Sequence, residues 1–417
     1  MPAEIPEERS VACATYPYWR RNTLVLAIGC FVAQLGFTLI EPFLPHYLIS
    51  LGLQRDQAFW SGMNLSITSI TYALMAPIWG GLADRHGKRM MMLRAGLGIA
   101  LCYVVIGLAR NPGQVFVARA VLGLLSGYIP SAIMLAATNT PESELGLALG
   151  VIQTAVSAGT IAGPLVGGAV AEWAGLRGTF FVSAALLFCA TVPPLLLVRE
   201  RVLRRERPAK VGAEVRQAWA NPSLRRLFIA LFLTQAAVQT VQPTLPLWVA
   251  KLVKSRVALV TGAVYSLMGV SMALGATAIG RQVNRWGAER AFRASLVLAA
   301  VLFVFQGLAQ TVSALAGIRF LAGFSLAAIT VAGNLLVAQA ASPENRGMAF
   351  GVLNSVSSIG GVAGPVLGGV MGDHLGLASP FFGSAALLGL AAVGLMAEER
   401  LTGFQQRISA VHSARRG

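Results

Sequence analysis

Glu41 and Arg119 are the two ionisable side chains whose place in the sequence could carry chemistry inside a membrane. Among 17 acidic residues, Glu41 alone lies well inside a long apolar segment, and Arg119 lies inside another. A charge at the centre of a bilayer costs about 2.5–3.5 kcal/mol on insertion scales, so such residues usually have a partner or a role. Both are predicted in the outer half of their segments, so they could pair. A carboxylate that alternates between an arginine and a proton would exchange protons; a static salt bridge, or a carboxyl group hydrogen-bonded near the membrane surface, is the structural alternative.

The cysteines and histidines, which could ligate a metal or act as nucleophiles, do not have the spacing of a metal site or a catalytic motif. The cysteines form no CxxC pair, and the histidines are scattered. These residues are Cys13, Cys30, Cys102 and Cys189, and His46, His86, His374 and His412. No nucleotide-binding or nucleophile motif occurs either. We therefore expect no metal site, no cofactor and no enzymatic activity.

Long apolar segments must position the two charges. Of the 417 residues, 55% are hydrophobic and only 12% are charged, against about 25% charged in soluble proteins. Runs of roughly twenty apolar residues are typical of transmembrane helices. Twelve are predicted, at 23–48, 60–82, 90–108, 113–138, 146–170, 178–198, 226–250, 257–282, 290–309, 313–338, 347–371 and 380–397. The polar first 21 residues do not read as a signal peptide, so the first span is expected to remain as an anchor.

The distribution of basic residues predicts the topology. With the N-terminus inside, 25 of the 33 Lys and Arg residues fall in cytoplasmic segments and only 6 outside. This is the positive-inside pattern, and it places the tails 1–22 and 398–417 and the basic linker 199–225 in the cytoplasm. The net charge of +16 therefore indicates topology and contact with anionic lipid rather than a nucleic-acid partner.

An internal repeat divides the chain into two similar halves. The segment GTIAGPLVGG (159–168) returns 201 positions later as GGVAGPVLGG (360–369). Six spans in each half predict two bundles, 23–198 and 226–397, as a parallel repeat about an axis normal to the bilayer. Glu41 aligns with Gln242, whereas Arg119 aligns with Arg319. Any proton chemistry should therefore lie in the first half, and the repeated arginine leaves a purely structural role open for Arg119.

The repeated Gly-Pro motif predicts close helix packing. Its residues are Gly150, Gly159, Gly163, Pro164, Gly167 and Gly168. Glycines four apart form one smooth stripe on a helix, where a second helix can approach closely. We interpret the stripe as a sliding seam between the two halves; ordinary small-residue packing is the alternative.

Several motifs resemble those of a known family. The run GGLADRHGKR (80–89) resembles the loop signature of the major facilitator superfamily, G-x-L-A-D-R-x-G-R/K-R/K. The Gly-Pro motif resembles the antiporter motif of its exporters, and LxxxRxxxG around Arg119 resembles the helix 4 motif of proton-coupled members. GFTLIEPFLP (36–45) resembles the helix 1 motif of the twelve-helix drug:proton antiporters. In the second half, Asn284 takes the place of Asp84.

The resemblance implies an all-α membrane protein with twelve helices in two six-helix bundles. It further implies a monomeric, proton-coupled antiporter that exports lipophilic drugs, cationic ones among them, across the bacterial inner membrane and draws on the proton gradient. The loop signature implies a cytoplasmic gate, in which Asp84 meets an arginine or a helix N-terminus; a solvated charged loop is the alternative. Its residues are Gly80, Asp84, Arg85, Gly87, Lys88 and Arg89.

Polar and aromatic residues in the spans are candidates for a substrate cavity, with helix packing as the alternative for each. They are Gln34, Phe37, Tyr72, Gln153, Gln235, Gln239, Gln242, Trp248, Tyr265, Asn334 and Asn354. Two other functions remain open. A narrow-substrate carrier of the same fold could move a sugar, organic acid or siderophore, and a non-transporting sensor or lipid scramblase would need neither Glu41 nor the gate.

Overall fold

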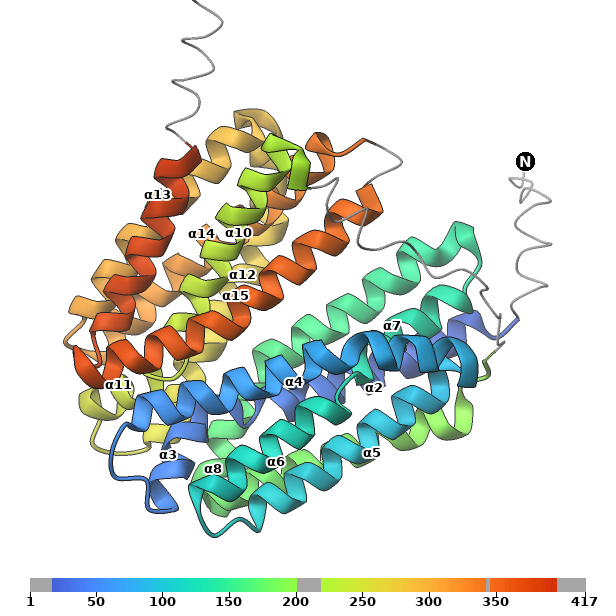
Figure 1. The fold of residues 1–417 in the computed structure, drawn as a ribbon, viewed down its shortest axis with the longest axis horizontal. Helices are drawn as coiled ribbons and strands as arrows, with labels where there is room; N and C mark the ends of the chain where they lie inside the picture. The colour runs from blue at the N-terminus through green and yellow to red at the C-terminus, as the bar shows by residue number, and fades with distance from the viewer. Residues whose placement is uncertain (1–16, 201–218, 343–345, 396–417) are drawn as a thin grey trace, which may run out of the picture. The chain divides into compact units, whose positions relative to one another are not determined.

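A computed structural model describes residues 17–200, 219–342 and 346–395, and all regular structure in these ranges is helical (Figure 1). The helices group into two compact units. Unit 1 lies within Met1–Pro208 and also takes in Leu245–Gly269; unit 2 lies within Ala209–Thr244 and Val270–Gly417. The predicted bundle boundaries stay a prediction. Leu245–Gly269 groups with unit 1 because α11 packs against α3 and η1.

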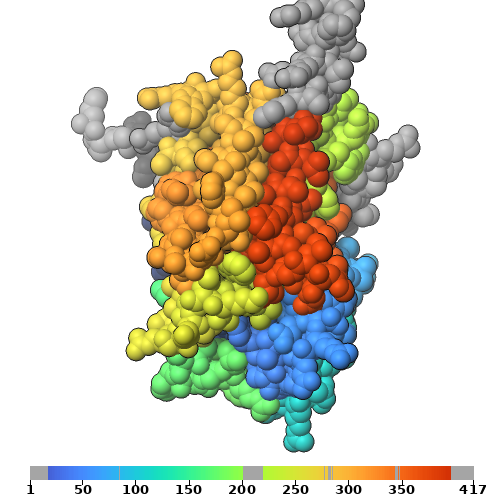
Figure 2. All heavy atoms as spheres, turned by 90° about the vertical axis from the view of Figure 1, so that its left-hand side faces the viewer, coloured from blue at the N-terminus to red at the C-terminus, as the bar shows by residue number. Residues whose placement is uncertain are grey.

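Unit 1 contains the helices of the first half of the chain. They are α2 (Trp19–Thr38), the 3₁₀ turn η1 (Glu41–Phe43), α3 (Leu44–Ser50), α4 (Gln57–His86), α5 (Lys88–Gly107), α6 (Pro112–Leu125), α7 (Tyr128–Thr138), the 3₁₀ turn η2 (Glu142–Glu144) and α8 (Leu145–Leu197). It also holds α11 (Leu245–Leu252) and the beginning of α12 (Val257–Trp286). Figure 2 looks onto the end of this unit where the turns after α3, α5 and α11 and the bend of α8 emerge (blue, teal, yellow and green).

Unit 2 contains the remaining helices. They are α10 (Pro222–Thr240), the rest of α12, α13 (Ala288–Leu308), α14 (Val312–Ala340), α15 (Arg346–His374) and a shorter apolar helix, Ser379–Leu395. Within it α10 packs on α15, and α13 packs on α14.

The helices account for the twelve predicted spans. Within the described ranges, nine helical segments are long and apolar enough to cross a membrane, and the bent pair α10–α11 makes a tenth. One of the nine, Glu142–Leu197, contains a break at Gly175, where φ is +72°, and so supplies two spans. With Ser379–Leu395, each predicted span has its own helical segment, continuous or broken, and the prediction of an all-α membrane fold is confirmed.

Prolines interrupt two spans of unit 1 that the sequence predicted as continuous. The first span breaks between α2 and α3, where Pro42 and Pro45 each lack an N–H donor. The fourth breaks between α6 and α7 at Gly127, where φ is +133°. Pro130 explains this second break, because it cannot donate to the Ser126 carbonyl four residues earlier and its ring clashes with that group.

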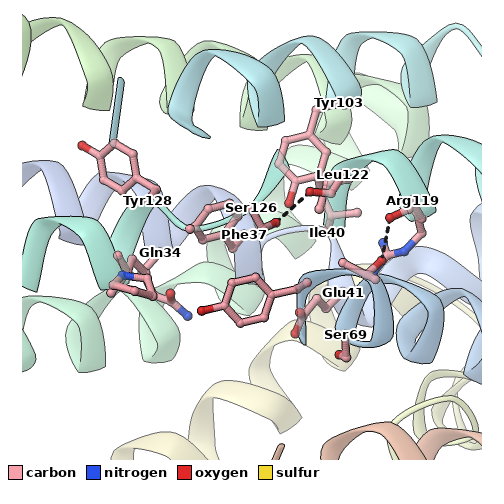
Figure 3. A pocket seen from close by; sticks show the side chains of 15 residues that line it. Gln34, Phe37, Ile40, Glu41, Ser69, Tyr103, Arg119, Leu122, Ser126 and Tyr128 are labelled. Atoms are coloured by element: carbon pink, nitrogen blue, oxygen red, sulfur yellow. Dashed lines mark hydrogen bonds between the residues drawn. The ribbon is translucent and has the colours of Figure 1, made fainter. Parts of the chain in front are cut away.

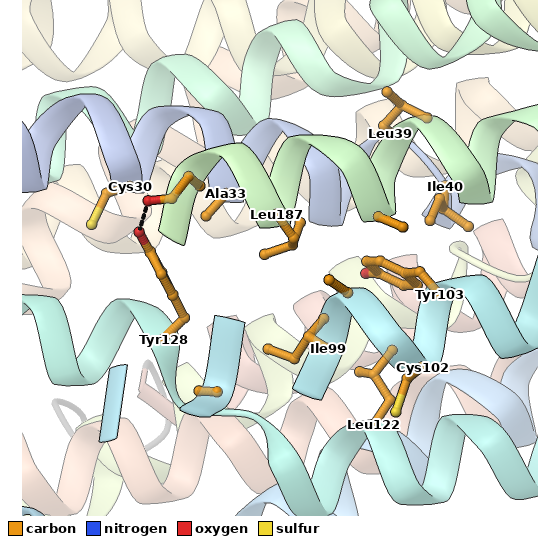
Figure 4. Packing of buried hydrophobic residues seen from close by; sticks show 14 of the residues in the cluster. Cys30, Ala33, Leu39, Ile40, Ile99, Cys102, Tyr103, Leu122, Tyr128 and Leu187 are labelled. Carbon is orange, nitrogen blue, oxygen red and sulfur yellow. Dashed lines mark hydrogen bonds between the residues drawn. The ribbon is translucent and has the colours of Figure 1, made fainter. Parts of the chain in front are cut away.

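The core of unit 1 is built around α2, whose largest interface is with α8. Glycines allow the close approach, since a Cβ at Gly36 of α2 would overlap Leu187 of α8. Buried residues of α2, α5, α6 and α8 contribute to this core (Figure 4). Tyr128 crosses this core and donates a hydrogen bond of 2.7 Å to the Ala190 carbonyl. The core thereby fixes the helices that carry Glu41 and Arg119.

Candidate functional site

A cavity of about 340 Å³ opens within unit 1. It is lined by side chains from α2, η1, α4, α5, α6 and α7, namely Gln34, Phe37, Ile40, Glu41, Thr68, Ser69, Tyr72, Tyr103, Arg119, Leu122, Ser126, Gly127, Tyr128, Ile129 and Pro130. Figure 3 shows Glu41 and Arg119 toward one end and Gln34 and Tyr128 toward the other. The breaks between α2 and α3 and between α6 and α7 both border the cavity. Non-helical backbone in a membrane protein is tolerated where it lines a cavity or is buried in protein, and not where it faces lipid.

Glu41 lines the cavity and is exposed. It stands at the first residue of η1, just before Pro42. Among the residues that the structure describes, none donates a hydrogen bond to it, and no salt bridge joins it to Arg119. The two charges nevertheless interact through space. This arrangement leaves the carboxylate accessible to a proton or to a bound cation.

Arg119 is held by the backbone of its neighbour helix. Its side chain is 6% exposed, and its Nε donates a hydrogen bond of 2.9 Å to the Asn64 carbonyl in α4. The Thr68 hydroxyl shares its hydrogen between the Arg119 carbonyl and the Asn64 carbonyl of its own helix, each 3.2 Å away. Four residues on, Gly123 is required because a Cβ there would overlap Thr68. The LxxxRxxxG motif therefore joins α6 to α4 and points the guanidinium into the cavity.

Two tyrosines that sequence reasoning missed complete this site. Tyr103 of α5 is 4% exposed and lines the cavity together with Glu41 and Arg119. Tyr128 begins α7 directly after the Gly127 break. The sequence signal was available for Tyr128, since the GYIP run combines a glycine with a proline three positions later. No local pattern marks Tyr103, because it lies in a uniformly apolar helix.

The predicted cavity residues divide into three groups. Gln34, Phe37 and Tyr72 line the cavity. Those of unit 1 that do not line it are the exposed Gln153 and the half-buried Trp248 and Tyr265. Those in unit 2 are Gln235, Gln239, Gln242, Asn334 and Asn354, for which a cavity role stays a prediction.

In unit 2 the counterparts of the charged pair are bonded to amides. Gln242, which aligns with Glu41, donates a hydrogen bond of 3.3 Å to Gln239. Arg319, which aligns with Arg119, donates one of 3.1 Å to the fully buried Gln306. The acidic group thus belongs to unit 1, in line with the asymmetry that the repeat predicts.

The glycine stripe of α8 faces α2, within the same unit. A Cβ at Gly159 would lie 2.7 Å from the Phe31 carbonyl oxygen, and one at Gly163 or Gly167 would overlap Thr38 or Leu39. The prediction of a seam between the two halves is wrong for these three glycines, because α2 occupies the face that their four-residue spacing creates.

The other members of the Gly-Pro motif behave differently. Gly168 lies on the neighbouring face of α8, where a Cβ would come 2.7 Å from the Ala258 carbonyl of α12. A Cβ at Gly262 of α12 would in turn overlap the Pro164 carbonyl. A Cβ at Gly150 would meet nothing within 4 Å, so this glycine has no packing requirement here.

The loop signature forms the turn between α4 and α5, and Glu200 caps the start of α5 there. Gly87 adopts φ +93° between α4 and α5, a conformation that favours glycine. The Glu200 carboxylate, just after α8, accepts hydrogen bonds of 2.7 Å and 3.0 Å from the backbone N–H groups of Lys88 and Arg89. The Arg89 guanidinium donates to the Leu195 carbonyl.

The expected role of Asp84 stays a prediction, because its side chain lies outside the described residues, as does that of Asn284. Arg85 is exposed at the end of α4, and a Cβ at Gly80 would meet nothing within 4 Å. The carboxylate that the structure does place at a helix N-terminus is Glu200, which lies far from the signature in sequence and therefore escaped prediction.

Comparisons with known proteins agree with this architecture. The model of the Major Facilitator Superfamily matches residues 26–278 and 227–404. "Multidrug resistance protein MdtG" of Enterobacter lignolyticus (strain SCF1) is 36% identical over 391 residues, which is 92% of this chain and 94% of that protein. The protein of the same name from Salmonella typhimurium (strain LT2) is 35% identical over 89% of this chain and 93% of its own length.

Solved structures share the fold at low identity. A bacterial homologue of the human lysosomal transporter Spinster has a TM-score of 0.79 and 17% identity, covering 92% of this chain and 97% of that chain. The nucleoside transporter NupG has a TM-score of 0.78 and 15% identity, covering 90% and 98%. Sequence and fold agree over nearly the whole chain, which therefore belongs to the major facilitator superfamily.

Proposed function

We propose that this protein is a multidrug efflux antiporter of the bacterial inner membrane, which exports lipophilic small molecules in exchange for protons. The names of the 35–36% identical relatives support multidrug export. On this proposal the chain works by alternating access as a monomer with both termini in the cytoplasm. It needs no cofactor beyond the proton gradient and catalyses no covalent step.

The observation that carries the proton-coupling part is the carboxylate of Glu41, which shares a cavity with Arg119 and has no hydrogen-bond or salt-bridge partner among the described residues. A carboxylate that faces an aqueous opening can accept a proton, and its charge then no longer attracts the guanidinium. Because the protonated and charged forms interact differently with Arg119, each favours a different arrangement of the helices. Substrate and proton can then compete for one site, and this competition couples their opposite movements.

The cavity lining suits lipophilic substrates. Phe37, Tyr72, Tyr103 and Tyr128 supply aromatic surface, while Gln34 supplies hydrogen-bonding groups. Pockets for small molecules combine mostly apolar walls with a few polar groups. The Glu41 carboxylate and the aromatic faces would both attract a cationic substrate.

The test is dye export from inverted membrane vesicles that contain the protein, with an imposed proton gradient. We expect lipophilic dye cations to accumulate inside acidified vesicles and to leak back when a protonophore collapses the gradient. Accumulation that survives the protonophore would contradict proton coupling. Movement of one sugar, organic acid or siderophore, with no dye transport, would favour a narrow-substrate carrier instead, and lipid flipping without solute transport would favour a scramblase.

A further inference from the structure

A groove between α5 and α6 is a second cavity of unit 1, and it shares no lining residue with the Glu41 cavity. Its volume is about 920 Å³. It is lined by Leu101, Cys102, Val105, Leu108, Ala109, Asn111, Gly113, Gln114, Val117, Ala118, Val121 and Leu125. The apolar rim is largely exposed, with 64% of Leu101 and 63% of Val117 accessible. On helices that span a membrane, such a surface meets lipid rather than water.

The groove has the length of a lipid chain. Its lining residues run from Asn111, the N-cap of α6, to Leu125, the last residue of α6. The 14 residues of α6 rise about 21 Å at 1.5 Å per residue. One leaflet of the hydrocarbon core is about 15 Å thick, half of the bilayer core. An extended acyl chain therefore fits along the groove without leaving it.

One end of the groove is polar and basic. At the turn between the helices, the Asn111 side chain accepts a hydrogen bond of 2.9 Å from the Gln114 N–H, and the Gln114 side chain accepts one of 2.7 Å from the Arg110 N–H. Arg177 of α8 donates a hydrogen bond of 3.1 Å to the Ala109 carbonyl. The exposed Arg110 guanidinium has no partner among the described residues. Arg110 does not itself line the groove, but it lies in the chain between two residues that do, Ala109 and Asn111.

The internal repeat offers a natural comparison. At the corresponding positions of α13, α14 and their turn, Phe305 replaces Val105, Gln310 replaces Arg110 and Ala314 replaces Gln114. Phenylalanine is larger than valine, and glutamine carries no charge. The second half therefore differs from the first at one position that lines the groove and at the basic residue of the turn.

We propose that the α5–α6 groove is a phospholipid site, which holds one acyl chain along Val105, Val117 and Val121 and an anionic headgroup at Arg110. The apolar groove complements an acyl chain, and the basic residue at its end complements a negative headgroup. An anionic phospholipid is therefore favoured over a neutral or zwitterionic lipid. The site is separate from the proposed transport cavity and does not depend on the transport function.

The test is native mass spectrometry of the purified full-length protein, titrated with phosphatidylglycerol or phosphatidylethanolamine of the same chain length. We expect phosphatidylglycerol to bind about fivefold more tightly, which is the factor that one basic residue contributes at an anionic surface. Arg110→Gln should remove this preference and leave some binding. Val117→Trp should fill the groove and remove the bound lipid of both types, and Val121→Phe should do so in part.

Two controls separate the site from general lipid contact. Leu321→Trp places the same ring on the corresponding surface of α14, where Leu321 is 55% exposed, and should leave lipid binding unchanged. Arg55→Gln removes another exposed arginine from unit 1 and should leave the headgroup preference unchanged. Equal affinity for the two lipids, or equal losses in Val117→Trp and Leu321→Trp, would overturn the proposal. The test measures lipid binding and not dye export. A negative result would therefore overturn the lipid proposal and leave the proposed transport function unaffected.

Discussion

The hydroxyl of Thr38 in α2 shares its hydrogen between the Gly159 carbonyl of α8, 3.2 Å away, and the Gln34 carbonyl of its own helix, 2.9 Å away. This contact crosses the glycine stripe, and the missing side chain of Gly163 makes room for Thr38. A hydrogen bond from a side chain to the backbone of another helix requires the two helices to lie close together. The glycine stripe therefore forms a rigid joint between α2 and α8 inside unit 1.

Gly163→Ala should destabilise this joint. The new methyl group would overlap the Thr38 side chain, and overpacking costs about 1–3 kcal/mol. We expect a lower midpoint of thermal unfolding in detergent, measured by the loss of monodisperse protein on heating. Gly150→Ala is the matched control, because it adds the same methyl to the same helix in open space. Equal midpoints for the two variants would show that the stripe is not closely packed.

Removal of the Glu200 carboxylate should loosen the start of α5. Glu200→Ala leaves the N–H groups of Lys88 and Arg89 without their acceptor, and the loss of a helix cap costs about 0.5–2 kcal/mol. We expect faster backbone hydrogen exchange at 88–91, with a smaller effect in Glu200→Gln, which keeps one acceptor oxygen. Glu172→Ala, at an exposed acidic residue of α8, should leave exchange at these residues unchanged. Unchanged exchange in Glu200→Ala would mean that water replaces the cap.

The sequence predicts the spans well and singles out Glu41 and Arg119 as charged residues inside them, for a physical reason. The length of an apolar segment can be read from consecutive residues, and so can a charge that is costly in lipid. The twelve segments, and Glu41 as the acidic residue inside one of them, are therefore visible in the sequence itself. The repeat likewise exposes the asymmetry between Glu41 and Gln242 without any structure.

Three-dimensional neighbours were harder to predict. The four-residue spacing shows that Gly159, Gly163 and Gly167 share a face, but it does not say which helix meets that face. The same limit hid Tyr103 and Glu200, whose roles come from helices that are distant in sequence. The break at Gly127 was missed because the apolar run continues through it, and hydrophobicity outweighed the local glycine and proline signals.

Pro130→Ala should straighten the fourth span. An alanine N–H at this position could donate to the Ser126 carbonyl and extend α6 into α7. Trp79 now donates a hydrogen bond of 2.7 Å to the Leu124 carbonyl next to the break, and a straight helix would move this contact. Because residues 126–130 line the cavity, we expect weaker dye export with undiminished thermal stability. Pro112→Ala is the control, because a proline at the first position of α6 removes no helical hydrogen bond. Normal export by Pro130→Ala would show that the break is not needed.

Glu41→Gln should separate proton coupling from substrate binding. The amide keeps the shape of the carboxyl group but cannot change its charge, so it mimics a permanently protonated site. We expect dye accumulation driven by the proton gradient to fall to background in vesicles, whereas exchange of labelled for unlabelled dye without a gradient should continue. Binding of a neutral dye, followed by fluorescence quenching, should change by less than tenfold, since loss of one contact between partly solvated groups is worth at most about 1.4 kcal/mol.

Glu142→Gln, at an exposed residue of η2, controls for a loss of acidic charge as such and should transport normally. Gradient-driven export that persists in Glu41→Gln would assign the coupling proton to another group, and loss of both exchange and binding would show that the carboxylate serves substrate recognition alone.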